Sequence, residues 1–176
     1  MINATTVEKI IKIVHMIIVI QNMLQEFVMV NNFAKKENGK IDDQISDKKI
    51  PVRLAFIKPN GSPSVISLWY IEVDGRMYCA TQRRAKITSY LKNNPICGFE
   101  IAADKPPYKG TRGQGEVRII EEKGEEILQL LIEKYLGRKE STLSKFLQKK
   151  SISEVAIEIT PKTIFKYDFT KRMQDI

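Results

Sequence analysis

Histidine and cysteine are scarce in this chain, which limits the chemistry that its side chains can carry out. The 176 residues include one histidine, His15, and two cysteines, Cys79 and Cys97. The single histidine falls on a predicted apolar helix, so we expect neither a histidine-dependent catalytic triad nor a histidine metal cluster. The cysteines form no CxxC motif, so we expect no zinc site and interpret both as small buried residues in a reducing cytoplasm.

The chain also lacks an apolar run long enough to cross a membrane. The most apolar stretch, Ile10–Ile20, is interrupted by Lys12 and is shorter than the roughly 20 residues that a spanning helix needs. The residues before it have neither the cationic region nor the cleavage site of a signal peptide. Thr5 and Glu8 fit a capping box, which predicts a helix over about 6–30. We expect this helix to pack on the core or on a partner subunit, and contact with a membrane surface is the less favoured alternative.

Acidic residues are outnumbered by basic ones, with 21 Asp and Glu against 29 Lys and Arg and a formal net charge of +8. Such an excess suits a nucleic acid, an anionic membrane or a phosphorylated ligand. The lysines are scattered along the chain, which is typical of a solvated surface. Because no recognition motif accompanies them, we expect no nucleic-acid partner.

Changes in composition divide the chain into four parts. The folded part is long enough to bury a core of its own. The role of the N-terminal part stays open, as does a natural start within it at Met23 or Met29. The parts are a helical extension (1–32), a polar linker (33–50), the folded domain (51–170) and a C-terminal tail (171–176).

The folded domain is predicted to be mainly β, with short strands joined by turns. Asp74-Gly75 is a hairpin signal, because glycine tolerates the positive φ of a tight turn. Pro161 is expected to interrupt the sheet, since proline donates no ladder hydrogen bond, and 104–112 is expected to form a loop. Runs rich in β-branched and aromatic residues predict strands at 52–57, 65–73, 76–81, 96–102, 113–120, 155–159 and 164–169.

Three helices are predicted among these strands. The first, over 87–93, must end before Pro95. The second, over 125–136, is amphipathic and ends at Gly137, and a short third helix covers 143–147. Because the helices occur singly and do not alternate with strands, a doubly wound parallel sheet is not expected. The pattern favours an antiparallel barrel with peripheral helices.

A basic segment lies between the hairpin and the first of these helices. Arg83, Arg84 and Lys86 place three cations just ahead of the helix N-terminus. A helix N-terminus offers free N–H groups and a partial positive charge. Together with the cations, it predicts a phosphate-binding site.

Five segments, taken in order, carry a resemblance to a known family. They are similar to its DG-x-P…PLWF strand pair, its DG-x-LYFAT hairpin, its SRK…L-x-x-NP helix, its Y-x-G-x-R-x-x-G loop, and the RYLG and ITP…WDF motifs of one branch. The corresponding residues are 60–70, 74–81, 84–95, 108–115, and 134–137 with 159–169. On these motifs the chain resembles the FMN-binding split barrel of the pyridoxamine 5'-phosphate oxidase-like superfamily, over about 52–169.

The resemblance implies an antiparallel Greek-key split barrel that forms a homodimer, with FMN in a groove at the subunit interface. It also implies an oxidoreductase that transfers a hydride at the flavin and acts on a small molecule. Such an enzyme needs no triad or metal cluster, because the hydride chemistry belongs to the cofactor. The resemblance implies that Arg84, Lys86, Thr81 and Gln82 bind the phosphate, that Ser67, Leu68 and Trp69 run along the ring, and that Ala80 also contacts the cofactor. Arg112 and Gln114 would come from a loop of the same or the partner subunit.

The chain departs from the family pattern in three ways. The spacing from Thr81 to Lys86 is one residue shorter than in some relatives. Ala85 stands near the place of the serine in the SRK motif. The C-terminal arginine and histidine motif that binds substrate in true pyridoxamine phosphate oxidases is missing, so pyridoxal phosphate synthesis is not expected.

Three alternative functions stay open, and the first of them keeps the fold and changes the cofactor. The RYLG and ITP…WDF motifs resemble a branch with members that use an 8-hydroxy-5-deazaflavin coenzyme, which also carries phosphate. A non-catalytic flavin- or haem-binding module is a second alternative, although haem requires an axial ligand and His15 is the only histidine. A basic nucleic-acid-binding barrel is a third, and it would need more aromatic residues among the cations. The substrate and the electron donor stay open.

Overall fold

The structure, a computed structural model, describes residues 49–137 and 141–174. The predicted N-terminal helix, His15 and nearly all of the linker lie outside these residues. No helix in the part of the chain that the structure describes is long and apolar enough to cross a membrane. The described helices are α3 (Lys86–Asn93), α4 (Gly124–Leu136) and α5 (Thr142–Lys149), with the short 3₁₀ turns η1 (Ser151–Ser153) and η2 (Thr170–Met173).

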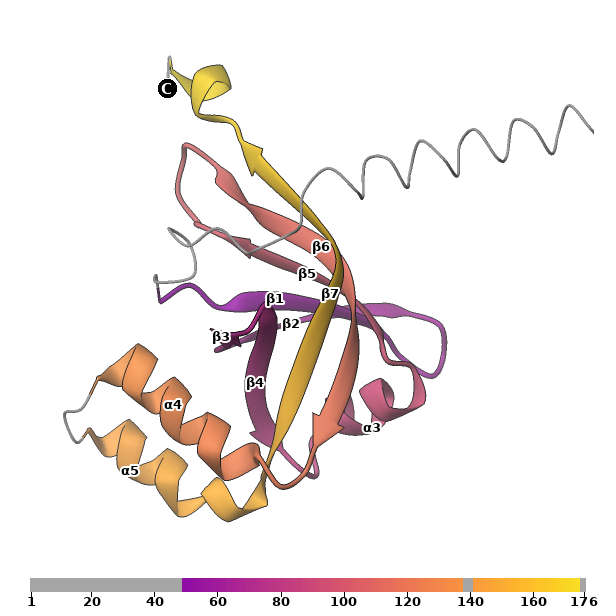
Figure 1. Cartoon of the computed structure of the whole chain (residues 1–176), viewed down its shortest axis with the longest axis vertical. Helices are drawn as coiled ribbons and strands as arrows, with labels where there is room; N and C mark the ends of the chain where they lie inside the picture. Colours follow the sequence, from indigo (N-terminus) through magenta and orange to yellow (C-terminus); the bar gives the residue numbers. More distant parts are fainter. Residues whose placement is uncertain (1–48, 138–140, 175–176) are drawn as a thin grey trace, which may run out of the picture. The chain divides into compact units, whose positions relative to one another are not determined.

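Seven antiparallel strands form one curved sheet within the described residues (Figure 1). Their spatial order is β2-β1-β5-β6-β7-β4-β3, and the sheet does not close, so β2 and β3 are its edges. The prediction of a mainly β, antiparallel fold with peripheral helices is confirmed. The strands are β1 (Val52–Ile57), β2 (Pro63–Leu68), β3 (Ile71–Val73), β4 (Arg76–Gln82), β5 (Ile96–Ala102), β6 (Lys109–Ile120) and β7 (Glu154–Asp168).

The prediction of a single strand over 65–73 is wrong, because the strand is interrupted at Trp69 and Tyr70. β2 pairs with β1, whereas β3 pairs with β4 at the opposite edge of the sheet. The backbone of Tyr70 bonds to side chains of α4 instead of a neighbouring strand. Its N–H donates to the Tyr135 hydroxyl (3.3 Å), and its carbonyl accepts from Lys134 Nζ (3.0 Å). These bonds satisfy the polar groups that the break removes from the ladder.

Two further predictions about strands need correction. β7 runs without interruption through Pro161, and β6 begins at Lys109, inside the predicted loop. The register between β6 and β7 shifts at Gln114/Gly115, where Gly115 lies opposite Pro161. A bulge is the place where a sheet accepts a proline, because the ladder is already disrupted there.

The local signals for turns and helix ends are confirmed. Asp74 and Gly75 both have positive φ, 51° and 73°, as a tight hairpin between β3 and β4 requires. Gly137 ends α4 with φ 78°. The predicted helices over 87–93, 125–136 and 143–147 each agree with α3, α4 and α5 to within two residues at either end.

The core lies inside the curved sheet, with a smaller cluster under α4. Ile127, Leu131 and Tyr135 of α4 pack on Ala156 of β7 in that cluster. In the main core, Cys79 and Cys97 are buried free thiols, as predicted. Burial raises the pKa of both thiols, and that of Cys97 rises to about 11.

Gly113→Ala is expected to destabilise the protein by about 1–3 kcal/mol, because the added methyl has no room. A Cβ at this position would lie 2.0 Å from the Thr163 carbonyl oxygen and 2.6 Å from Phe99 Cζ. Gly98→Ala is the matched control, since its Cβ would lie 3.6 Å from Ala55 Cβ, an ordinary contact. Urea denaturation measures the difference, and equal midpoints for the two variants would contradict the close approach of β6 to β7.

Candidate functional site

A cavity of about 530 Å³ lies between the strand ends and helices α4 and α5, and we call it the helix-side cavity. Figure 1 shows α4 and α5 side by side next to β4 and β7. Six of the predicted cofactor-binding residues line this cavity, although they come from two segments that pair with different strands. These six are Ser67, Leu68, Trp69, Ala80, Thr81 and Gln82.

The remaining wall of the cavity is mainly apolar and comes from the two helices. Leu128 and Leu131 extend from α4, and Leu143, Phe146 and Leu147 extend from α5. Sequence reasoning predicted α5 as a helix but did not place it at the site. Its amphipathic pattern was the available signal, but that pattern cannot say which surface the helix covers.

Trp69 is held in place by α4. Its ring stacks on that of Tyr135, with centroids 4.8 Å apart and planes 6° apart. The Tyr135 hydroxyl donates to the Ile50 carbonyl (2.9 Å) and accepts from the Tyr70 N–H. An aromatic wall anchored in this way is ordered before any ligand arrives, which reduces the entropy cost of binding.

The polar end of the cavity contains a carboxyl that sequence reasoning missed. Glu154, the first residue of β7, lines the cavity and accepts a hydrogen bond from Gln82 Nε2. Gln82 Oε1 in turn accepts from the Ser153 hydroxyl (2.8 Å). Burial raises the pKa of Glu154, and the hydrogen bond from Gln82 lowers it in part. The signal in the sequence was an acidic residue directly before the apolar run Val155-Ala156-Ile157.

Arg84 and Lys86 lie outside the helix-side cavity, on the segment that follows β4. Both side chains are exposed, and neither has an ion-pair or hydrogen-bond partner among residues 49–137 and 141–174. Arg83 differs, because it forms an ion pair with Glu121, which also bonds Lys92 (2.7 Å). Ala85 precedes α3 without a side-chain cap. The N-terminus of α3 therefore presents two unpaired cations and uncapped N–H groups.

Arg112 and Gln114 line a different cavity, on the open face of the sheet. This sheet-face groove has a volume of about 580 Å³. The structure therefore does not bring Arg112 and Gln114 together with the six residues of the helix-side cavity. The groove is lined by residues of five strands, namely Arg53, Ala55, Val65, Gly98, Phe99, Glu100, Arg112, Gly113, Gln114 and Phe165.

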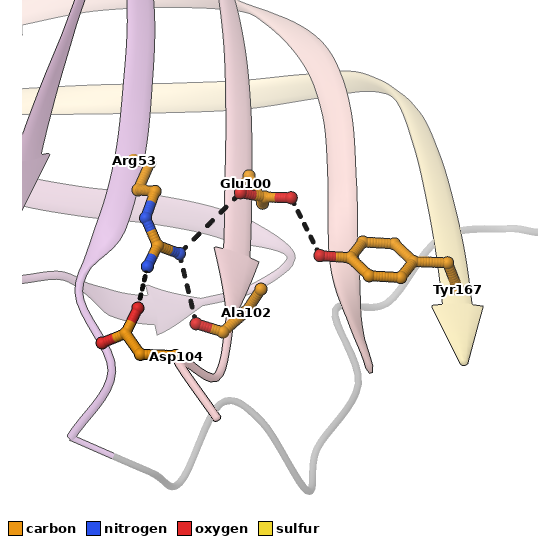
Figure 2. Close-up of polar contacts among 5 residues, drawn as sticks. All are labelled: Arg53, Glu100, Ala102, Asp104 and Tyr167. Atoms are coloured by element: carbon orange, nitrogen blue, oxygen red, sulfur yellow. Dashed lines mark hydrogen bonds and ion pairs between the residues drawn. The ribbon is translucent and has the colours of Figure 1, made fainter. Parts of the chain in front are cut away.

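A polar network borders this groove (Figure 2). Arg53 donates to the Ala102 carbonyl (3.2 Å), forms an ion pair with Asp104 and lies 3.8 Å from Glu100. Glu100 also accepts a hydrogen bond from the Tyr167 hydroxyl, through the carboxylate oxygen that does not face Arg53 (2.8 Å). Burial, together with this hydrogen bond, raises the pKa of Tyr167 to about 12.

Of the two arginines that line this groove, one is free to bind a ligand. Arg53 has both Asp104 and Glu100 beside it. The Arg112 guanidinium lies 5.7 Å from the centre of the Tyr167 ring, and it has no carboxylate partner in the part of the chain that the structure describes. Arg112 is thus the groove residue best able to bind an anionic or carbonyl group.

No family model matches the sequence, and no curated protein matches it. Solved structures do match the fold. An F420 reductase has a TM-score of 0.61 and 16% identity, covering 72% of this chain and 98% of its own. A candidate pyridoxamine 5'-phosphate oxidase from Listeria innocua has a TM-score of 0.53 and 17% identity, covering 70% and 92%. A FAD-binding protein from Mesorhizobium loti has a TM-score of 0.53 and 16% identity, covering 71% and 90%.

These matches show that the chain has the split-barrel fold of pyridoxamine 5'-phosphate oxidase-like proteins, as its motifs predicted. The same fold occurs in proteins with other roles. A heme storage protein from Vibrio cholerae matches with a TM-score of 0.56 and 13% identity, covering 69% of this chain and 89% of its own. The function therefore has to be argued from the site.

Proposed function

We propose that the protein is an oxidoreductase that binds FMN and acts on a small molecule. The observation that carries this proposal is the composition of the helix-side cavity. There the segments Ser67–Trp69 and Ala80–Gln82 meet at one wall, and the strand β4 leads directly into the unpaired cations Arg84 and Lys86. The fold supports the proposal, because a FAD-binding protein and an F420 reductase share it.

The residues of the cavity fit a flat ring with one apolar and one polar edge. Leu68, Trp69 and Leu131 offer apolar surface, whereas Thr81 and Gln82 offer hydrogen-bonding groups. The family resemblance implied that Thr81 and Gln82 bind the phosphate, and we assign them to the polar edge of the ring instead. Bound here, a flavin-type group supplies hydride transfer, which side chains alone do not. The chain's own residues bind and orient the ring, and the helices α4 and α5 shield it from water.

The segment before α3 fits the phosphate. Arg84 and Lys86 supply two positive charges, and the uncapped first turn of α3 supplies N–H donors. A phosphate that binds here has no competing carboxylate, since Glu121 is already shared between Arg83 and Lys92. We assign these two cations to phosphate binding and leave Arg83 as a structural residue.

We further propose that the protein acts as a homodimer. Arg112 and Gln114 line a cavity separate from that of the other predicted residues, so we assign their contact with the cofactor to a second subunit. Two apolar side chains of the sheet-face groove support an interface there, because Val65 is 64% exposed and Phe165 is 47% exposed.

Phe165→Asp is expected to convert the dimer to a monomer and to weaken cofactor binding, because it places a charge in the apolar interface. Light scattering measures the mass, with about twice the chain mass of 20.2 kDa expected for the unmodified protein. Ile152→Asp is the control, since Ile152 is 86% exposed and lies outside the groove. A monomeric unmodified protein that still binds cofactor would contradict the dimer.

A deazaflavin coenzyme is the second candidate, and the match to an F420 reductase favours it. The experiment that decides is the absorbance spectrum of the purified protein, with mass spectrometry of whatever heat releases. Flavin bands and the mass of FMN are expected. A single band near 420 nm, about the value of the free deazaflavin, would show that the bound cofactor is the deazaflavin coenzyme and not FMN. A protein that binds neither compound when supplied would contradict the oxidoreductase.

The double variant Arg84→Ala, Lys86→Ala is expected to lower FMN affinity by about a hundredfold or more, without unfolding the protein. The reason is the loss of two charge-assisted contacts, each worth roughly 1.5–3 kcal/mol. Lys105→Ala with Lys171→Ala is the control, because it removes the same charge from exposed positions elsewhere. Fluorescence titration with FMN compares the two, and wild-type affinity in the first variant would show that the phosphate binds elsewhere.

A further inference from the structure

Glu154 is a nearly buried carboxyl at the polar end of the helix-side cavity. The residue is only 7% exposed, yet it lines the cavity opposite Gln82 in the strand register. Its Oε1 accepts the hydrogen bond from Gln82 Nε2. Its Oε2 has no hydrogen-bond partner in the described part of the chain. One oxygen of the carboxyl is thus held by the protein, and the other is available to a ligand.

Neighbouring residues set the orientation of this carboxyl. The Ser153 hydroxyl donates to Gln82 Oε1 at 2.8 Å, which turns Gln82 Nε2 toward Glu154. Behind it, the N-terminus of α4 lies against the Glu154 backbone, where a Cβ on Gly124 would be 2.1 Å from the Glu154 carbonyl oxygen. The Glu154 backbone is thus closely packed, and the hydrogen bond from Gln82 holds its carboxyl at the cavity.

The charged groups around Glu154 do not neutralise it. Lys150, after α5, lines the same cavity, but its Nζ lies 4.4 Å from the Phe146 ring. Glu125 of α4 accepts from the Ser151 hydroxyl (2.8 Å), and Arg83 after β4 is paired with Glu121. None of these groups forms an ion pair with Glu154 in the residues that the structure describes. A buried carboxyl without a cation favours its protonated form, and burial raises the pKa of Glu154 accordingly.

We propose that Glu154 is a ligand-recognition residue of the helix-side cavity, donating a hydrogen bond from protonated Oε2 to an acceptor atom on the polar edge of the bound ring. This inference rests on the proposed function and deepens it. The apolar wall at Leu68 and Trp69 receives the apolar edge of the ring, so the edge that bears carbonyl oxygens meets Glu154. Ionisation of Glu154 would set a carboxylate against those carbonyl oxygens and would weaken binding.

The test is the pH dependence of FMN affinity in three forms of the protein. Trp69 is the only tryptophan of the chain and lines the cavity, so quenching of its fluorescence reports binding there. Between about pH 5 and pH 8, the wild type is expected to lose affinity relative to Glu154→Gln by about tenfold, roughly 1.4 kcal/mol. The amide of Glu154→Gln can still donate a hydrogen bond, so this variant is expected to bind FMN like the wild type at low pH. Glu154→Ala has no donor and is expected to bind FMN weakly at every pH.

Two comparisons isolate the effect of Glu154. The FMN phosphate itself titrates near pH 6, but it does so equally with every variant, so the ratio between wild type and Glu154→Gln removes it. Glu126→Gln, an exposed change on α4 with the same loss of charge, is expected to follow the wild type at every pH.

The outcomes separate this inference from the proposed function. A constant ratio between wild type and Glu154→Gln, or a wild type that gains affinity relative to Glu154→Gln as pH rises, would overturn the donor role and leave the FMN site in place. No binding of FMN by any form at any pH would overturn both.

Discussion

The interruption between strands β2 and β3, at Trp69 and Tyr70, is the constraint on which the rest of the site depends. β2 before it and β3 after it belong to opposite edges of the sheet, so the backbone here leaves the ladder. The Tyr135 hydroxyl and Lys134 Nζ take the two hydrogen bonds of Tyr70. Without them, buried backbone groups would be left unpaired, at a cost of about 1–3 kcal/mol each.

Helix α4 thereby links the sheet to the cavity. The same Tyr135 that bonds Tyr70 also stacks on Trp69, while Ile127 and Leu131 bury the apolar face of α4 on Ala156. The start of the helix is equally constrained, because Gly124 lies against the Glu154 backbone and a larger residue would collide. The helix-side cavity is therefore lined, beneath α4, by the end of β2, the end of β4 and the first residue of β7.

The basic side chains of this protein fall into two groups, those that already pair with a carboxylate and those that do not. Arg83 and Lys92 share Glu121, and Arg53 lies beside Asp104 and Glu100. Arg84, Lys86 and Arg112 have no carboxylate partner among the described residues. An anionic ligand gains most from cations of the second kind, because it need not displace an existing partner. The proposed phosphate site and the proposed contact across the dimer both use such residues.

Local sequence by itself determined the strands β1, β4 and β5, the three helices, the Asp74-Gly75 hairpin and the end of α4 at Gly137, because each depends on residues within a few positions. The motifs also indicated the split-barrel fold, and six predicted cofactor-binding residues do meet in one cavity. Only the tertiary structure decided the break at Trp69, since the groups that satisfy Tyr70 lie 64 and 65 positions along the chain. It likewise decided the continuity of β7 through Pro161, the separation of Arg112 and Gln114 from the other six, and the place of Glu154. Those features depend on which distant groups meet, and no local pattern contains that information.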